Sequence, residues 1–245
     1  MDPFSLPPVA ALLDLTARGL MAAITLLTPF AGPLSAALAV VLLTLVVRAL
    51  LVPAGIAQAK ADQTRARLAP RLRDLQKRHR SDRERLQRET MKLYRDEGAS
   101  PLAGCLPLLL QAPIVGLVYA VFVHPSIAGH LNPLLGETLF GVPLGRSFIA
   151  AATSGGIDLS VTIVFGAVVA TIAVVGELTR RLLRPAAALP LPAPQRAVAE
   201  VLPFLTAIIA LFVPLAAALY LLTTSAWTLG QRLVLRRRFP APPQT

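Results

Sequence analysis

Arg48 is the residue that most constrains the fold of this chain, because it lies inside the apolar run of residues 34–53. A run of about 20 apolar residues can cross a bilayer core as a helix, and an arginine inside such a helix costs roughly 2.5 to 3.5 kcal/mol on insertion scales. The guanidinium keeps its proton, so it has to face water, an acidic partner or a polar cavity between helices. Thr44 lies one turn earlier on the same helix face and would extend a polar stripe. The alternative is that Arg48 snorkels to the membrane interface from a helix that ends one turn later.

The composition is that of a polytopic membrane protein. Hydrophobic residues make up 55% of the chain and charged residues only 15%, and the mean hydropathy is +0.64. The single cysteine, Cys105, lies in an apolar stretch, so we expect a small buried residue rather than a disulfide or a metal ligand. The predicted spans contain neither paired carboxylates nor a nucleophile beside a base. We therefore expect no enzyme, no metal and no cofactor.

The apolar runs predict an all-α fold with a core of five transmembrane helices. These helices occupy residues 33–57, 100–123 and 158–179 and, as a closely joined pair, residues 198–235. In the second helix, Gln111 is expected to hydrogen-bond to a neighbouring helix or to line a cavity.

Polar residues in the closing helix set it apart from the other predicted spans. Tyr220, Thr224 and Gln231 lie in a polar run that is unsuited to a helix with lipid on all sides. We therefore expect part of this helix to face protein or water.

The N-terminal segment, residues 1–32, is apolar with scattered polar residues. It predicts an amphipathic helix lying on the outer surface of the membrane, and an additional span is the alternative. The sequence has no basic region before this apolar stretch, which argues against a cleaved signal peptide.

Residues 58–99 are densely charged, with both signs interleaved. Leucines at helical spacing give each half one thin apolar edge, which predicts a helical hairpin turning near residues 79–82. A solvated charged loop is the alternative. Either form belongs outside the bilayer.

The placement of basic residues predicts the topology. Of the 24 lysines and arginines, all but Arg18, Arg48 and Arg146 fall in the hairpin, in a connector at residues 180–197 or near the C-terminus. The chain ends in a basic tail at residues 236–245. The positive-inside rule then places these segments in the cytoplasm, and the N-terminus and the loop of residues 124–157 outside. The net charge of +11 mainly orients the protein and favours anionic lipids as partners.

Four segments together resemble the YidC-type membrane protein insertase family. They are residues 43–53 (LTLVVRALLVP), 89–94 (ETMKLY), 100–113 (SPLAGCLPLLLQAP) and 219–231 (LYLLTTSAWTLGQ). The resemblance covers nearly the whole chain from about residue 34 to residue 238, in matching order. Because no large external domain precedes the core, the chain resembles the compact form found in single-membrane bacteria.

The resemblance implies a bacterial plasma-membrane insertase and chaperone that works as a monomer. Arg48 matches the family's arginine in a hydrophilic groove that is closed to the outside, and Thr44 matches a groove-lining position. The implied substrates are nascent membrane proteins, with the ribosome and the Sec translocon as further candidate partners and no role for DNA. The candidate substrate-binding residues are Arg48, Thr44, Gln111, Tyr220, Thr224 and Gln231.

A small anion transporter or channel that uses Arg48 as its anion site is the alternative function. Transporters often contain internal repeats, and none is apparent here. A charged hairpin of about forty residues would also have no evident role in such a protein.

Overall fold

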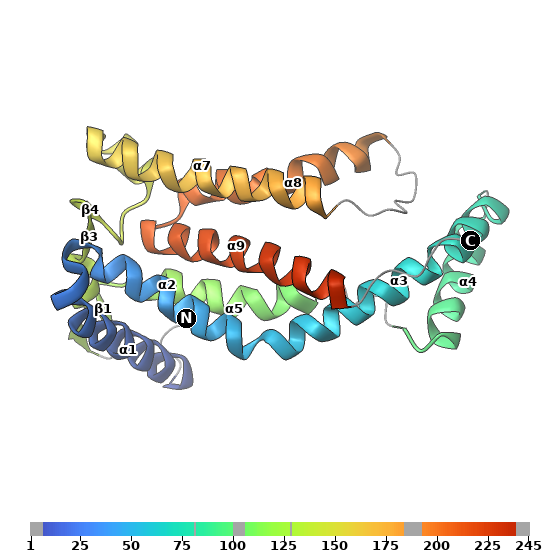
Figure 1. Ribbon diagram of the computed structural model, residues 1–245, viewed down its shortest axis with the longest axis horizontal. Helices are drawn as coiled ribbons and strands as arrows, with labels where there is room; N and C mark the ends of the chain where they lie inside the picture. Colours follow the sequence, from blue (N-terminus) through green and yellow to red (C-terminus); the bar gives the residue numbers. More distant parts are fainter. Residues whose placement is uncertain (1–6, 81, 100–105, 128, 184–192, 239–245) are drawn as a thin grey trace.

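Long apolar runs separated by short polar breaks give the chain a helical architecture (Figure 1). The computed structural model describes residues 7–80, 82–99, 106–127, 129–183 and 193–238. The chain is mostly helical, as predicted for an all-α protein, and two short antiparallel strand pairs are the β structure within these ranges. The elements in chain order are α1 Pro7–Ala31, the 3-10 turn η2 Gly32–Leu34, α2 Ser35–Leu50, α3 Val52–Arg78, α4 Arg83–Asp96, α5 Leu106–Val121, β1 Ser126–Ile127, β2 His130–Leu131, the 3-10 turn η4 Pro133–Gly136, β3 Thr138–Leu139, β4 Val142–Pro143, α6 Phe148–Thr153, α7 Leu159–Leu182, α8 Ala193–Phe212 and α9 Leu215–Arg238.

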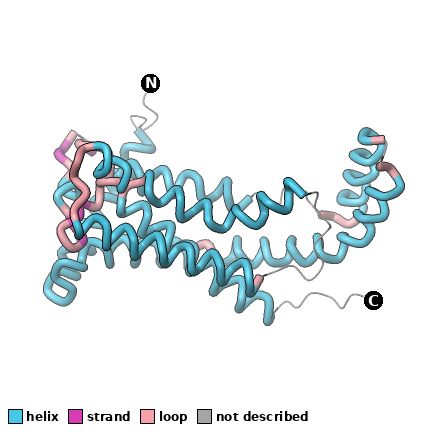
Figure 2. The backbone as a smooth tube through the Cα atoms, turned by 90° about the horizontal axis from the view of Figure 1, so that it is seen from above, coloured by secondary structure: helices cyan, strands magenta, loops and turns pink. Residues whose placement is uncertain are grey.

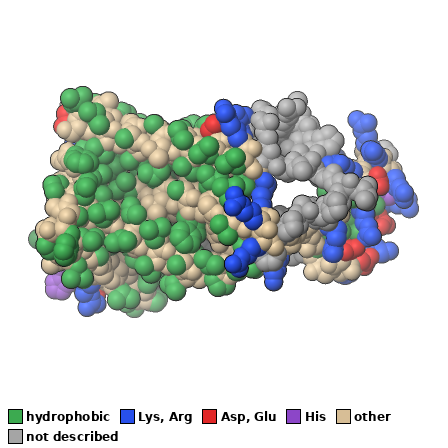
Figure 3. Space-filling model, in the orientation of Figure 1, with side chains coloured by type: hydrophobic (Ala, Val, Ile, Leu, Met, Phe, Trp, Pro, Cys, Tyr) green, Lys and Arg blue, Asp and Glu red, His purple; other side chains and the backbone are tan. Residues whose placement is uncertain are grey.

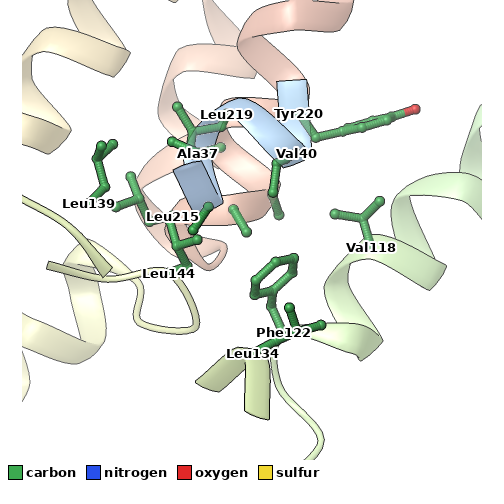
Figure 4. Close-up of a cluster of buried hydrophobic side chains, with 14 of the residues drawn as sticks. Ala37, Val40, Val118, Phe122, Leu134, Leu139, Leu144, Leu215, Leu219 and Tyr220 are labelled. Carbon is green, nitrogen blue, oxygen red and sulfur yellow. The ribbon is translucent and has the colours of Figure 1, made fainter. Parts of the chain in front are cut away.

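Helix α9 is the central element of the bundle. It packs against α2, α5, α7 and α8, and in Figure 1 it runs through the middle of the body. Every residue from Leu215 to Tyr220 is buried. Figure 4 shows this first part of α9 meeting apolar side chains of α2, α5 and the segment that follows α5, including Val40 and Phe122. Apolar packing is therefore concentrated at one end of α9.

Helix α1 packs along α2 after the chain turns at Gly32, whose φ of +50° suits a residue without a side chain. Leu13, Ala17, Leu20 and Ile24 are buried at helical spacing. The opposite face is also apolar and exposed, with Phe30 89% accessible. Such a face suits lipid, and the choice between a surface helix and an additional span stays open.

Two stretches of the described residues are long and apolar enough to cross a membrane. They are Pro7–Leu50, which contains α1, η2 and α2, and Leu159–Leu182, which is α7. The predicted arrangement of five spans stays a prediction.

The first core helix does not run unbroken over residues 33–57 as expected. Helix α2 ends at Leu50, and α3 starts at Val52 and continues to Arg78. Pro53 lies in the first turn of α3, where its missing N–H costs least. The last apolar residues of the predicted span therefore share one helix with the first charged arm.

Helices α3 and α4 form a projecting pair, joined by a turn after Arg78 (Figures 1 and 2). The Asp82 side chain accepts a hydrogen bond from the Arg85 N–H at 2.9 Å and caps α4. At the other end of α4, Glu97 forms ion pairs with Arg67 and Arg71 of α3. A charged cavity of about 360 Å³ lies between the two arms.

The end of the molecule opposite this pair is built from the short strands (Figure 2). Residues 124–157 were expected to be a loop, but they contain β1–β4, η4 and α6. The carbonyls of Leu144 and Arg146 accept hydrogen bonds from the N–H groups of Ala216 and Leu215, both at 3.0 Å. These bonds satisfy backbone donors in the first turn of α9 that a helix cannot satisfy itself. This segment, which we name the outer cap, therefore fixes the start of the central helix.

Asn132 joins the outer cap to α5. Its buried Nδ2 donates to the carbonyls of Val121 at 2.6 Å and His124 at 2.9 Å, and its Oδ1 accepts from the Leu134 N–H at 3.1 Å.

Asn132→Ala should lower the free energy of unfolding by about 2 kcal/mol, because buried carbonyls lose their donors. Thermal unfolding in detergent would measure this. Leu131→Ala is the matched control, since Leu131 is 89% exposed; equal midpoints for the two variants would contradict the assigned role of Asn132.

Most lysine and arginine side chains gather toward the hairpin end in Figure 3, whereas hydrophobic side chains are spread over the rest of this face, with a few charged side chains and a histidine at the far end. Helix α9 continues to Arg238, so the first residues of the predicted C-terminal tail are helical. The Arg236 guanidinium donates to the carbonyls of Leu182 at 3.1 Å and Leu183 at 2.7 Å. This contact caps the C-terminus of α7, where a cation is favourable.

Candidate functional site around Arg48

Arg48 lies in the last turn of α2, where this helix packs against α9. Its side chain is half-buried, and its Nε donates to the Thr224 hydroxyl oxygen at 3.3 Å. Thr224 itself is only 7% exposed. The arginine is therefore held against a buried polar group of the central helix rather than extending freely from the end of α2.

Tyr220 adds a second hydroxyl to this contact. Its side chain lies close to the Thr224 hydroxyl and to the Arg48 guanidinium. Figure 4 shows the phenol ring projecting away from the labelled apolar cluster. The three side chains make a polar cluster at the point where the continuously buried first part of α9 ends.

Thr44 lies on the same stretch of α2 and is also buried, with 2% exposure. Its hydroxyl donates to the Val40 carbonyl at 2.7 Å. A threonine can satisfy its hydroxyl inside a membrane helix in this way. The structure thus places Thr44 at the α2 interface with its donor already used.

Gln231 lies two turns after Thr224 on α9. Its Oε1 accepts a hydrogen bond from the Trp227 indole at 3.2 Å. Its carboxamide lies directly over Gly55 of α3, because a Cβ added to Gly55 would come within 2.1 Å of the Gln231 Nε2. Gln231 was a predicted site residue, whereas Gly55 was not among the predicted ones.

The two contacts share one register. Arg48 and Thr224 are 176 residues apart in the chain, as are Gly55 and Gln231. Equal separations mean that α2 and α3 run parallel to α9. The chain therefore stays alongside α9 across the break at Leu51.

Gln111 is the remaining candidate. It lies on α5, but its side chain falls outside the described residues. Its predicted role stays a prediction.

Comparison with known proteins decides the family. Residues 26–242 match the model of the 60Kd inner membrane protein family. The chain belongs to this family. All six candidate residues lie within the matched range, and so do the hairpin and the outer cap.

Three relatives of this chain are named membrane protein insertase YidC, which confirms the predicted resemblance. The Streptomyces avermitilis protein is 29% identical over 222 residues, covering 84% of this chain and 52% of the relative. The Oceanobacillus iheyensis protein is 40% identical over 98 residues, covering 38% of this chain and 39% of the relative. The Clostridium perfringens protein is 43% identical over 81 residues, covering 33% of this chain and 34% of the relative. The aligned part of this chain thus spans about half the length of the first relative and less of the other two.

Family membership supports the prediction that this chain is a membrane protein. It does not by itself assign roles to the residues around Arg48. Their proposed roles depend on burial, charge and position between α2 and α9.

Proposed function

We propose that this protein is a membrane protein insertase and chaperone of the bacterial plasma membrane. Its substrates are nascent membrane proteins whose short outer tails must cross the bilayer. The observation that carries this proposal is the half-buried Arg48, which contacts Thr224 at the α2–α9 interface. The names of the relatives point in the same direction.

The proposed topology has five spans and a cytoplasmic hairpin. The spans are formed by α2, α5, α7, α8 and α9, with the N-terminus outside and the C-terminus inside. The concentration of Lys and Arg toward the hairpin end supports this orientation. The outer cap then lies on the opposite side and closes that end of the bundle.

Arg48 acts by attracting acidic residues in the tail of a substrate. Its polar surroundings stabilise the cation, while the low dielectric of the membrane interior makes its attraction for a carboxylate stronger than in water. The tail moves along the polar cluster as the apolar segment that follows it passes into lipid. Burial of that segment provides the driving force, at about 25 cal/mol per Å². No covalent step is needed.

Reconstitution is the direct test of insertase activity. The purified protein is placed in liposomes, and a small single-span substrate is synthesised in vitro in their presence. We expect the substrate tail to become protected from external protease only in liposomes that contain the protein. Equal protection in empty liposomes would contradict the proposal.

Accessibility distinguishes an insertase from an anion channel. Thr228 lies one turn beyond Thr224 toward the hairpin end and is partly buried. In a Cys105→Ala background, we expect Thr228→Cys to react with a membrane-impermeant thiol reagent from the cytoplasmic side alone, because the outer cap closes the other side. Exposed positions calibrate the assay: Ser126→Cys should react from outside and Gln76→Cys from inside. Reaction of the Thr228→Cys variant from both sides would favour the channel.

A further inference from the structure

Gly55 leaves room for the Gln231 carboxamide of α9 to pack against the backbone of α3, and any larger residue at this position would displace that carboxamide. A Cβ at this position would lie 2.1 Å from the Gln231 Nε2 and 2.9 Å from its Cδ. Gly55 is in the second turn of the helix that leads into the charged hairpin. The carboxamide of Gln231 is therefore packed directly against the backbone at the base of the hairpin.

The carboxamide is only partly satisfied in this position. Its oxygen accepts from the Trp227 indole, whereas Nε2 is buried and has no hydrogen-bond partner among the described residues. A buried donor without an acceptor destabilises the state that contains it. The Gln231 carboxamide thus packs against Gly55 while one of its hydrogen-bonding groups, Nε2, has no acceptor among the described residues.

The backbone between Arg48 and Gly55 permits the contact to open. Helix α2 ends at Leu50, and Pro53 in the first turn of α3 lacks an N–H, which leaves a gap between the bonds from the Leu51 N–H to the Val47 carbonyl and from the Gly55 N–H to the Leu51 carbonyl, both at 3.1 Å. Helices bend at such positions. The base of α3 can therefore pivot near Leu51 while the contact between Arg48 and Thr224 stays in place.

We propose that Gly55 and Gln231 form a closure between α3 and α9 that opens to admit a substrate tail to Arg48. When α3 moves away, the Gln231 Nε2 donates to a backbone carbonyl of the entering polypeptide. Gly55 is a positioning residue, because it acts by bringing α3 against Gln231. This inference rests on the proposed insertase function and adds to it a point of entry and a contact that is independent of substrate sequence.

A disulfide across the closure tests whether it has to open. Gly55→Cys and Gln231→Cys are combined in the Cys105→Ala background, and insertion into liposomes is measured before and after oxidation. We expect oxidation to reduce the insertion rate about tenfold or more, and reductant to restore it. The matched control is a disulfide between Ser126→Cys and Leu131→Cys, which face each other across β1 and β2 in the outer cap; its oxidation should leave the rate unchanged.

Each outcome of this experiment is informative. Equal insertion by the oxidised and reduced forms of the first pair would overturn the closure. If that pair forms no direct disulfide, a short thiol-reactive cross-linker replaces the reach of the glutamine side chain, and failure of the cross-linker to join the two cysteines would overturn the close approach of α3 to α9. If the reduced double-cysteine protein inserts no substrate at all while the Cys105→Ala parent does, the two cysteines have damaged the site. The fluorescence of Trp227 then tests the closure instead. If that parent is also inactive, the proposed function itself fails.

Fluorescence of Trp227 gives a readout that does not depend on activity. Trp227 is the only tryptophan in the chain, and its indole bonds to Gln231. Adding a tryptophan-free acidic substrate peptide should shift the emission to longer wavelength and increase quenching by acrylamide. Gly55→Ala, whose methyl group displaces the carboxamide, should produce a shift without peptide. An unchanged spectrum in both cases, with peptide binding confirmed separately, would overturn the proposal.

Discussion

Arg48→Ala should reduce the insertion of substrates with acidic tails by roughly 100-fold. Two unit charges 4 Å apart attract by about 4 kcal/mol at an effective dielectric constant of 20, which is more than enough for this effect. Arg48→Lys should retain part of the activity, because it keeps the positive charge but loses the planar guanidinium that contacts Thr224. The initial rate of tail protection in liposomes measures both variants.

Arg18→Ala is the matched control for loss of a positive charge. Arg18 lies on α1, where it pairs with Asp14, and its side chain is 73% exposed. Its replacement should leave the insertion rate within about twofold, since exposed ion pairs contribute little. Full activity of Arg48→Ala at normal expression would exclude a role for Arg48 in substrate binding.

Deletion of residues 66–87 should leave a folded membrane protein that has lost most of its insertion rate. The deleted residues form the outer part of α3 and the start of α4, whereas the base of α3 that contacts α9 remains. The buried core cluster contains residues of α1, α2, α5, α7, α8, α9 and the outer cap, and none from the hairpin. The loss of rate is expected because the hairpin receives the substrate or covers the polar cluster.

Two measurements separate the possible outcomes of this deletion. Thermal aggregation in detergent reports folding, and the liposome assay reports insertion. A variant that aggregates like unfolded protein would show that the hairpin stabilises the bundle. A variant with unchanged insertion would show that the hairpin is dispensable.

The hairpin illustrates how far the sequence predicts local structure. The spacing of the leucines and the charge density placed its turn near residues 79–82, and in the structure α3 ends at Arg78 and α4 begins at Arg83. The environment of the leucines was harder to predict. Leu68 is only 1% exposed, and Leu75 and Leu93 line the cavity between the arms. Apolar residues on short amphipathic helices bury each other when a partner helix lies close.

The candidate site was predictable as a set of residues but not as a set of contacts. An intramembrane arginine and a polar final helix indicated Arg48, Tyr220 and Thr224 from the sequence alone. The contact between Gly55 and Gln231 depends on the register of two helices far apart in the chain, which helical periodicity does not determine. Glycine in a helix is unfavourable by roughly 1 kcal/mol relative to alanine, and this was the available signal for a close approach at Gly55.

The outer cap was missed for a related reason. Its strands are two residues long, which is too short for an alternation of polar and apolar residues to be detected in the sequence. They depend on tertiary contacts, such as the Asn132 side chain and the bonds to Leu215 and Ala216. Local sequence therefore predicted a loop where the fold contains short paired strands.

The central claim is that Arg48 recognises negative charge in the substrate tail, and a comparison of two substrates with two proteins tests it most directly. One substrate carries acidic residues in its tail, and the other carries the corresponding amides. Each is inserted by the unmodified protein and by Arg48→Ala, in liposomes without a membrane potential. We predict that the amide tail inserts roughly 100-fold more slowly in the unmodified protein, since the same charge attraction is lost, and that the two tails insert equally in Arg48→Ala. An equal difference between the tails in both proteins would contradict the claim.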